Sequence, residues 1–367
     1  MDLSKAFDCL PHDLLLLKLH EYGLAPKALT LIKSYLENRL QCVKLGQITS
    51  TYEHITKGVP QGSILGPVLF NIFINDIFLF VNNSTIYNYA DDNTLSSSDR
   101  SPEVVKSNLL QDSEILIKWF SDNKMQANPE KFQAIAIGQR SSDKIKSFQI
   151  NGIDIPCENE VKLLGVDIDF KLSFNSHVSN ICKKASKQLN CLKRVGKYLN
   201  RLGKLTIYHT FILSNFNYCP LVWHFCGETN TKKVERIQER ALRFIYNDFS
   251  NSYEDLLVKS KMPSLQLRRM RTLALESFKI VHGKSPLFLQ DLIVLKNNRY
   301  NFRYSNTAEV TQARTSRYGL SSFRHMAATV WNSLSNEARN MTSFNQFRSY
   351  IETWNGPTCK CSACRAS

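Results

Sequence analysis

Two adjacent aspartates, Asp91 and Asp92, are the residues whose types and spacing point most clearly to chemistry; they lie in the stretch YNYADDNT. This stretch predicts a β-hairpin with the pair at its turn, where two like charges repel unless a cation neutralises them. Hard divalent ions such as Mg²⁺ prefer oxygen ligands, usually one or two carboxylates together with substrate phosphates. The pair therefore indicates a metal site, although a bare Asp-Asp pair is also compatible with a turn that binds nothing.

A third carboxylate is available in Asp2, in the N-terminal stretch MDLSKAFD. Two metal ions about 3.5–4 Å apart can stabilise both the attacking and the leaving oxygens of a phosphoryl transfer. We therefore expect the carboxylates of Asp2 and Asp91 to converge within about 4–6 Å, close enough to share a cation.

The positions of proline, glycine and apolar residues predict the elements that must hold these carboxylates. We expect helices from Pro11 to near Gly23, from Pro26 to about Arg39, through the apolar stretch to about Val81, and from Pro102 to about Met125. Hairpins are expected around Gly46 and around the aspartate pair, and short strands at FQAIAIG, SFQI and VKLLGVDI. After about Asp169 the chain is expected to be almost entirely helical, at 176–200, 203–215, 229–247 and 264–282.

Composition limits the class of protein. The chain has 367 residues, of which 43% are hydrophobic, so it can bury a sizeable core in two or three domains. No run of 18 apolar residues occurs, so a membrane span is not expected. The ten cysteines are scattered except for the last three, and no secretory signal begins the sequence, which indicates free thiols in a reducing compartment.

The net charge of +15 is unevenly distributed. Residues 1–182 hold 17 Lys and Arg against 21 Asp and Glu, residues 183–284 hold 20 against 7, and residues 285–367 hold 10 against 4. A strongly basic helical part after an acidic part favours a polyanionic partner such as nucleic acid, although solvated helix faces would give the same composition.

Five stretches occur in the order of the palm motifs of reverse transcriptases: MDLSKAFD, GVPQGSILGPVLFNIFIND, YADD, NPEKFQ and KLLGV. Their wording resembles the RNA-directed DNA polymerases of jockey-type non-LTR retrotransposons, and FILSNFNYCPLVWHF and KKVERIQERALRFIYNDF extend the resemblance downstream. The resemblance implies an α/β (α+β) right-hand polymerase palm with an antiparallel sheet over residues 1–172. A basic helical thumb at 173–250, a helical C-terminal extension at 251–355 and a cysteine-containing tail at 356–367 would follow.

The resemblance also implies roles for individual residues. Asp2 and Asp91 would bridge two Mg²⁺ ions, or Mn²⁺ in their place, with Asp92 supporting them, and Lys131 would protonate the leaving pyrophosphate. Phe7 would pack under the incoming sugar and exclude a 2′-hydroxyl, or be ordinary core. Residues expected to contact the template and the incoming nucleotide are Gly58, Pro60, Gln61, Gly62, Tyr89 and Ala90, and those of the primer grip are Leu164, Gly165 and Val166.

Basic side chains after about Asn175 suit a thumb that follows a nucleic-acid backbone through sequence-independent phosphate contacts. Six of them fall within a few helical turns: Lys183, Lys184, Lys187, Lys193, Arg194 and Lys197. The aromatic residues Tyr208, Phe216, Tyr218 and Trp223 are expected to pack the core rather than to stack on bases.

The activity implied by the resemblance is RNA-templated DNA synthesis from dNTPs on a DNA primer, in an intracellular ribonucleoprotein and without a membrane. Only Met1 precedes Asp2, so we expect the preceding palm strand and the fingers to be missing, as in an N-terminally truncated copy. Primer extension would then be negligible until upstream residues are restored. The alternative interpretation is a catalytically inactive, nucleic-acid-binding remnant of such an element.

The C-terminal stretch CKCSAC places Cys359, Cys361 and Cys364 at a spacing typical of zinc ligands. A closed structural zinc site needs four ligands, and neither His nor Cys follows. A thiol-bearing tail is therefore the preferred interpretation, and zinc binding stays open because members of the resembled family carry a cysteine-rich element near this end.

Overall fold

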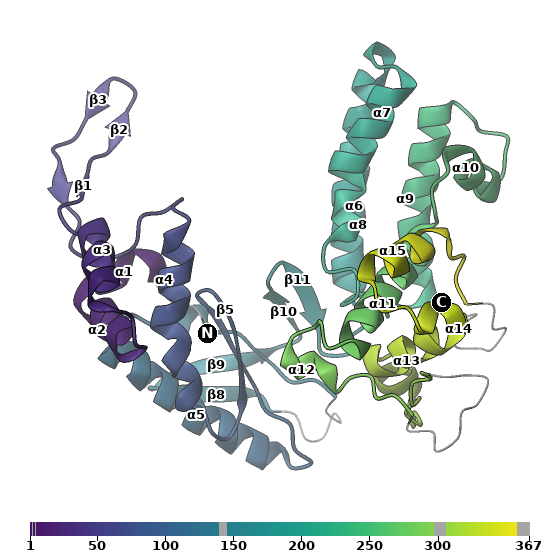
Figure 1. The fold of residues 1–367 in the computed structure, drawn as a ribbon. Helices are drawn as coiled ribbons and strands as arrows, with labels where there is room; N and C mark the ends of the chain where they lie inside the picture. The colour runs from purple at the N-terminus through teal and green to yellow at the C-terminus, as the bar shows by residue number, and fades with distance from the viewer. Residues whose placement is uncertain (2, 4, 139–144, 297–305, 358–367) are drawn as a thin grey trace. The chain divides into compact units, whose positions relative to one another are not determined.

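The computed structural model describes residues 1, 3, 5–138, 145–296 and 306–357. The chain divides into two compact units, Met1–Leu164 and Gly165–Ser367, and each is described by itself (Figure 1). In the ranges described, none of the helices is long and apolar enough to cross a membrane.

The first unit alternates helices with short strands, as predicted. Its helices are α1 (Ala6–Cys9), α2 (His12–Glu21), α3 (Pro26–Leu36), α4 (Leu65–Ile74), η1 (Asn75–Leu79), α5 (Pro102–Asp122) and η2 (Pro129–Lys131). Its strands are β1 (Leu40–Gln41), β2 (Lys44–Leu45), β3 (Ile48–Thr49), β4 (Glu53–His54), β5 (Thr85–Tyr89), β6 (Asp92–Ser96), β7 (Ala134–Ile135), β8 (Ser147–Ile150), β9 (Ile153–Glu158) and β10 (Glu160–Leu163). The predicted helices at Pro11 and Pro26 are confirmed as α2 and α3.

The sheets of this unit are small and mostly antiparallel. β1 pairs with β4 and β2 with β3 in one hairpin, which projects beyond α3 in Figure 1. β5 pairs with β6, and β9 lies between β8, to which it is antiparallel, and β7, to which it is parallel. The strand β9 was not predicted from the sequence.

The core of the first unit is formed by the apolar faces of α2, α4 and α5. Leu15, Phe70, Phe73, Leu116 and Phe120 are all completely buried in this cluster. The sequence predicts these helices to be amphipathic or apolar. Packing their apolar faces together removes those side chains from water.

Lys18 links α2 to α4 at the edge of this core. Its Nζ donates a hydrogen bond to the Phe73 carbonyl oxygen at 2.9 Å and forms an ion pair with Asp76 at 2.8 Å. The same ammonium lies over the rings of Phe73 and Trp119, at 4.4 and 4.6 Å from their centroids. Burial lowers the pKa of Lys18, and Asp76 acts in the opposite direction by favouring the charged form.

The second unit is predominantly helical, as predicted. It begins with β11 (Val166–Asp169), and its main helices are α6 (Asn175–Val195), α9 (Glu228–Tyr246), α11 (Leu265–Val281), α13 (Phe323–Ser333) and α15 (Phe344–Thr353). Shorter helices are η3 (Gly196–Tyr198), α7 (Arg201–Ile207), η4 (Tyr208–Ile212), α8 (Ser214–Asn217), α10 (Tyr253–Ser260), α12 (Leu287–Gln290), η5 (Ser316–Leu320) and α14 (Asn336–Arg339).

The predicted helix at 203–215 differs in one respect from the structure. It is divided into α7, the π-helical turn η4 and α8, and the backbone N–H of Leu213 donates to the carbonyl oxygen of Tyr208 at 2.8 Å, five residues earlier. The hydroxyl of Tyr208 donates to Gln238 Oε1 at 3.0 Å in the core. Single-turn π segments are rare, and apolar periodicity does not reveal them.

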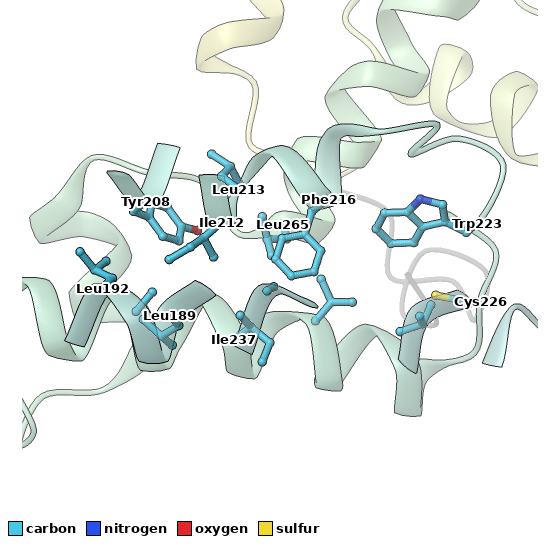
Figure 2. Close-up of a cluster of buried hydrophobic side chains, with 14 of the residues drawn as sticks. Leu189, Leu192, Tyr208, Ile212, Leu213, Phe216, Trp223, Cys226, Ile237 and Leu265 are labelled. Atoms are coloured by element: carbon cyan, nitrogen blue, oxygen red, sulfur yellow. The ribbon is translucent and has the colours of Figure 1, made fainter. Parts of the chain in front are cut away.

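Two clusters of buried side chains hold the second unit together. The first joins α6, η4, α8 and α9, and Figure 2 shows Leu189, Tyr208, Phe216 and Trp223 within it. The second joins α11, α13 and α15. The expectation that Tyr208, Phe216 and Trp223 pack the core is confirmed, whereas Tyr218 is about half exposed.

Asp169 fixes the turn between β11 and α6. Its carboxylate accepts hydrogen bonds from the backbone N–H groups of Lys171, Ser173 and Phe174, at 3.1, 3.1 and 2.7 Å, and from the Ser173 hydroxyl. Partial burial favours the neutral acid, but the hydrogen bonds from Ser173 and Phe174 outweigh it and lower the pKa of Asp169.

Candidate active site

The aspartate pair occupies the turn of a hairpin, as predicted. Tyr89 at the end of β5 pairs with Asp92 at the start of β6, and Ala90 and Asp91 form the two-residue connection. Ala90 has a φ of 54°, in the left-handed region, as tight hairpin turns require. Asp91 is half-buried and Asp92 exposed, so the hairpin presents two neighbouring carboxylates at its end.

Asn93, the residue after the aspartate pair, stabilises this turn through hydrogen bonds. Its side chain is buried, and its Nδ2 donates to the backbone carbonyl oxygen of Asp91 at 2.9 Å. The backbone N–H of Asn93 donates to the Met1 carbonyl oxygen at 3.2 Å, and the Met1 amino group donates to the Asn93 carbonyl oxygen at 2.6 Å. The N-terminal residue thus lies beside β6, two residues from Asp91.

The third candidate carboxylate, Asp2, lies outside the described residues, so its predicted convergence with Asp91 stays a prediction. Leu3, the next described residue, forms a β-bridge with Ala127. Across the residues whose positions are described, no group of three His, Cys, Asp or Glu side chains is arranged to hold a metal ion. Asp91 and Asp92 are the carboxylates at the turn, and their oxygens are of the type that Mg²⁺ prefers.

The loop GVPQG runs antiparallel to residues 7–11. The backbone N–H of Gly58 donates to the Leu10 carbonyl oxygen at 2.7 Å, and that of Val59 donates to the Phe7 carbonyl oxygen at 2.9 Å. Gly58 has a φ of 86°, and a Cβ atom there would lie 2.7 Å from the backbone oxygen of Asp8. Only glycine fits this close crossing of two backbones.

Two side chains tie the same loop to the N-terminal stretch. Gln61 Nε2 donates to Asp8 Oδ1 at 2.9 Å, and His12 Nε2 lies within hydrogen-bonding distance, 2.7 Å, of the Gly58 carbonyl oxygen. Asp8 and His12 were not assigned a role from the sequence. Their positions, next to Phe7 and at the start of α2, carry no spacing pattern that would have indicated these contacts.

Phe7 is half-buried and stacks on Phe70, with ring centroids 4.3 Å apart and an angle of 26° between the planes. This contact is core packing, and the remaining exposed part of the ring is compatible with a second role. Pro60 is half-buried, and Gly62, in the same loop, has a φ of 81° with open space where a Cβ atom would lie.

Lys131 and the predicted primer-grip residues lie in later segments of the chain. Lys131, at the end of η2, is exposed, and the adjacent Phe132 is buried. Leu164 and Gly165 both have positive φ, 46° and 81°, and separate β10 from β11. The segment VKLLGVDI, predicted as one strand, therefore consists of two strands separated by a tight two-residue turn.

Gly165 and Val166, the residues of this segment that belong to the second unit, have neighbours within that unit. The Tyr218 ring lies 3.4 Å from the position of a Gly165 Cβ atom, and Val166 is buried. Tyr218 therefore lies against the turn with one part of its ring, while about half of the residue stays exposed.

All six basic side chains predicted for the thumb are exposed: Lys183, Lys184, Lys187, Lys193, Arg194 and Lys197. Five lie in α6, whose opposite face is buried through Val178, Ala185, Leu189 and Leu192, and Lys197 follows in η3. Cys359, Cys361 and Cys364 lie outside the described residues, so zinc binding by the tail stays untested.

Comparison with known proteins defines the class. Residues 1–168 match the family model described as reverse transcriptase (RNA-dependent DNA polymerase). This match agrees with the order of the sequence motifs and indicates a reverse transcriptase domain in this part of the chain.

Several relatives are RNA-directed DNA polymerases of mobile elements. The chain is 28% identical over 253 residues to the probable RNA-directed DNA polymerase from transposon X-element of Drosophila melanogaster, and 26% identical over 255 residues to the RNA-directed DNA polymerase from mobile element jockey of the same organism. Each alignment covers 67% of this chain and 28% of the relative. The predicted resemblance to jockey-type elements is confirmed, and the chain spans just over a quarter of the length of these relatives.

A third relative is similar over a longer part of the chain. The retrovirus-related Pol polyprotein from type-1 retrotransposable element R1 of Bradysia coprophila is 24% identical over 297 residues, which are 79% of this chain and 27% of that protein.

Proposed function

We propose that the chain carries out RNA-templated DNA synthesis at the turn formed by Ala90 and Asp91. In this reaction the 3′-hydroxyl oxygen of a DNA primer attacks the α-phosphorus of a dNTP, a new phosphodiester bond forms, and pyrophosphate leaves. The observation that carries the proposal is the aspartate pair at the end of the β5–β6 hairpin, within a domain of the reverse transcriptase family.

Asp2, Asp91 and Asp92 would hold two Mg²⁺ ions in this proposal. When bound, such ions stabilise the attacking and leaving oxygens of the transfer. Two features of the described residues support the proposal: Met1 is hydrogen-bonded to Asn93, and Asn93 in turn holds the backbone of Asp91. Met1, the residue before Asp2, therefore lies next to the hairpin.

The chain's other residues would position substrates. Phe7, fixed by stacking on Phe70, would lie under the sugar of the incoming nucleotide and disfavour a 2′-hydroxyl. The loop with Gly58, Pro60, Gln61 and Gly62, together with Tyr89 and Ala90, would contact template and nucleotide, and its hydrogen bonds to residues 7–10 would keep it in register with Phe7. Lys131 would donate a proton to the leaving pyrophosphate, a role that suits a cation beside a phosphate.

Nucleic acid would be held by backbone and by charge. The turn of Leu164, Gly165 and Val166 would support the primer end, and the exposed basic face of α6 and η3 would contact phosphates without reading sequence. The partners in this proposal are an RNA template, a DNA primer and dNTPs.

Primer extension tests this proposal. Because the relatives extend well beyond the aligned part, the assay uses the chain alone and the chain in place of the matching segment of the jockey polymerase. The expected result is negligible extension by the chain alone and RNA-templated extension with Mg²⁺ by the chimaera. Asp91→Ala should slow extension by the chimaera about a thousandfold, since a lost metal ligand removes several kcal/mol of transition-state stabilisation. Asp154→Ala, at an exposed carboxylate on β9, is the matched control and should extend normally. Equal extension by both variants would contradict the proposal.

A further inference from the structure

Arg269, in α11, is a buried cation with hydrogen-bond donors that have no partner. Its side chain belongs to a residue that is only 3% exposed, and Nε and Nη1 are covered without making a hydrogen bond. Buried N–H groups are nearly always paired, because leaving them unpaired costs stability, and more so for a charged group. Two such donors on one guanidinium therefore need a functional or structural reason.

The neighbouring titratable groups do not neutralise this charge. His224 is buried beside it, and burial together with the Arg269 charge lowers the pKa of His224 to about 3, so the imidazole is neutral near pH 7. Burial raises the pKa of the Cys226 thiol, which therefore stays protonated and uncharged. The Arg269 guanidinium lies over the Trp223 ring, 4.8 Å from its centroid, but a ring face does not satisfy in-plane N–H donors.

The acidic residue whose charge acts on Arg269, Glu235, is already engaged elsewhere. Its carboxylate accepts the backbone N–H groups of Leu265 and Gln266 at 3.1 and 2.7 Å, and the Tyr253 hydroxyl at 2.6 Å. Glu235 thus caps the first turn of α11, and Nε and Nη1 of Arg269 remain without an acceptor.

A pocket of about 260 Å³ adjoins this guanidinium. Arg269 lines it together with Arg268, Asn217 and Thr272, all from the second unit. Arg268 is exposed, and its Nε donates to Asn217 Oδ1 at 3.0 Å, which holds a second guanidinium at the pocket.

We propose that this pocket binds a phosphate group through Arg269 and Arg268. The planar fork of a guanidinium matches the oxygens of a phosphate, and two adjacent arginines supply both donors and positive charge. Residues 183–284, which include the pocket, hold 20 basic against 7 acidic side chains, so the surroundings favour an anion. The phosphate belongs either to a polynucleotide backbone or to a free phosphate compound such as pyrophosphate.

Binding measurements on the full chain test this proposal and distinguish the two sources. One arm titrates pyrophosphate at constant ionic strength by calorimetry, and the other titrates a labelled single-stranded RNA by fluorescence anisotropy. The variants are Arg269→Met, Arg268→Met and the control Arg240→Met, which removes one exposed positive charge from α9 in the same unit.

For at least one probe, the affinities of wild type and Arg240→Met should agree within threefold. Arg269→Met should bind that probe at least tenfold more weakly. Arg269→Met should also unfold at the same or a higher temperature, because removing a buried unpaired charge is neutral or stabilising. If Arg269→Met does not fold, Arg268→Met must show the tenfold loss. A tenfold loss of affinity for pyrophosphate identifies the ligand as a free phosphate compound. A loss of affinity for RNA alone identifies it as a polynucleotide backbone. Binding of both probes that is unchanged in the arginine variants would overturn the proposal.

Discussion

At the residue scale, the loop that follows Lys57 depends on one glycine. Gly58 combines a left-handed backbone with an approach to Asp8 that leaves no room for a side chain. Gly23, which ends the turn after α2, has nearly the same φ, 85°, but open space around it. The two positions therefore separate the cost of backbone strain from the cost of a clash.

We predict that Gly58→Ala destabilises the chain more than Gly23→Ala. Backbone strain in the left-handed region costs an L-residue about 1–2 kcal/mol, which both variants share. The added clash with the Asp8 backbone should bring the cost at Gly58 to about 3 kcal/mol or more. Urea unfolding of the two variants measures the difference. Equal losses of stability would show that the backbone of residues 7–10 shifts at little cost in free energy.

How far single residues could be predicted depends on whether their role is local. The turn at Asp91 and the glycine at position 58 follow from local sequence, since tight turns restrict residue types strongly. The contacts of Gln61 with Asp8, and of Asn93 with Met1, join residues 53 and 92 positions apart. Such contacts depend on tertiary packing, as does the burial of Arg269, and no periodicity indicates them.

At the element scale, α6 combines a buried face with an exposed basic one. The apolar residues recur at helical spacing, so both the helix and its exposed lysines were predictable. The π turn in η4 and the strand β9 were not. The strand β9, whose sequence is IDIPCE, is exposed at four of its six positions and contains a proline, so its sequence gives little indication of a strand.

Replacing Lys183, Lys184 and Lys187 with Ala should weaken binding to an RNA–DNA hybrid and flatten its salt dependence. Each phosphate contact contributes about 0.7–0.9 to the slope of log affinity against log salt, so the slope should fall by about 2 to 3. The matched control replaces three exposed lysines of the first unit with Ala, Lys27, Lys33 and Lys44, and so removes the same number of positive charges. A salt slope that is the same in wild type and both triple variants would exclude α6 from the nucleic-acid interface.

The turn that precedes α6 should make stability depend on pH. Because hydrogen bonds lower the pKa of Asp169 in the folded chain, its stabilisation is present above the unfolded-state pKa of about 3.9 and is lost as pH falls through the lower folded value. Asp169→Asn should therefore cost about 1–2 kcal/mol at pH 7 and much less at pH 3.

Urea unfolding at the two pH values measures this effect. Asp154→Asn, at an exposed carboxylate, should change stability little at either pH. A loss for Asp169→Asn that is as large at pH 3 as at pH 7 would mean that the contribution does not come from the ionised carboxylate.

At the scale of the whole molecule, the reverse transcriptase motifs and the positive charge lie in different parts of the sequence. The family match ends at residue 168, and the 20 basic residues of segment 183–284 follow it. The similarity to reverse transcriptases was predictable because five motifs occur in order, and the mixture of helices and short antiparallel strands agrees with it. Catalysis depends on the relative placement of carboxylates to within about 1 Å, which motif order does not specify.

Metal binding by the Asp91 turn is the most direct test. Electron paramagnetic resonance titration of Mn²⁺ into the full chain, with template, primer and an unreactive dNTP analogue, counts bound ions in wild type, Asp91→Asn and the control Asp154→Asn. We predict two bound ions for wild type and for the control, and at least tenfold weaker binding for Asp91→Asn, whose neutral amide is a poorer ligand for a hard cation. Mn²⁺ binding by Asp91→Asn that equals wild type in number and affinity would contradict a catalytic metal site at this turn.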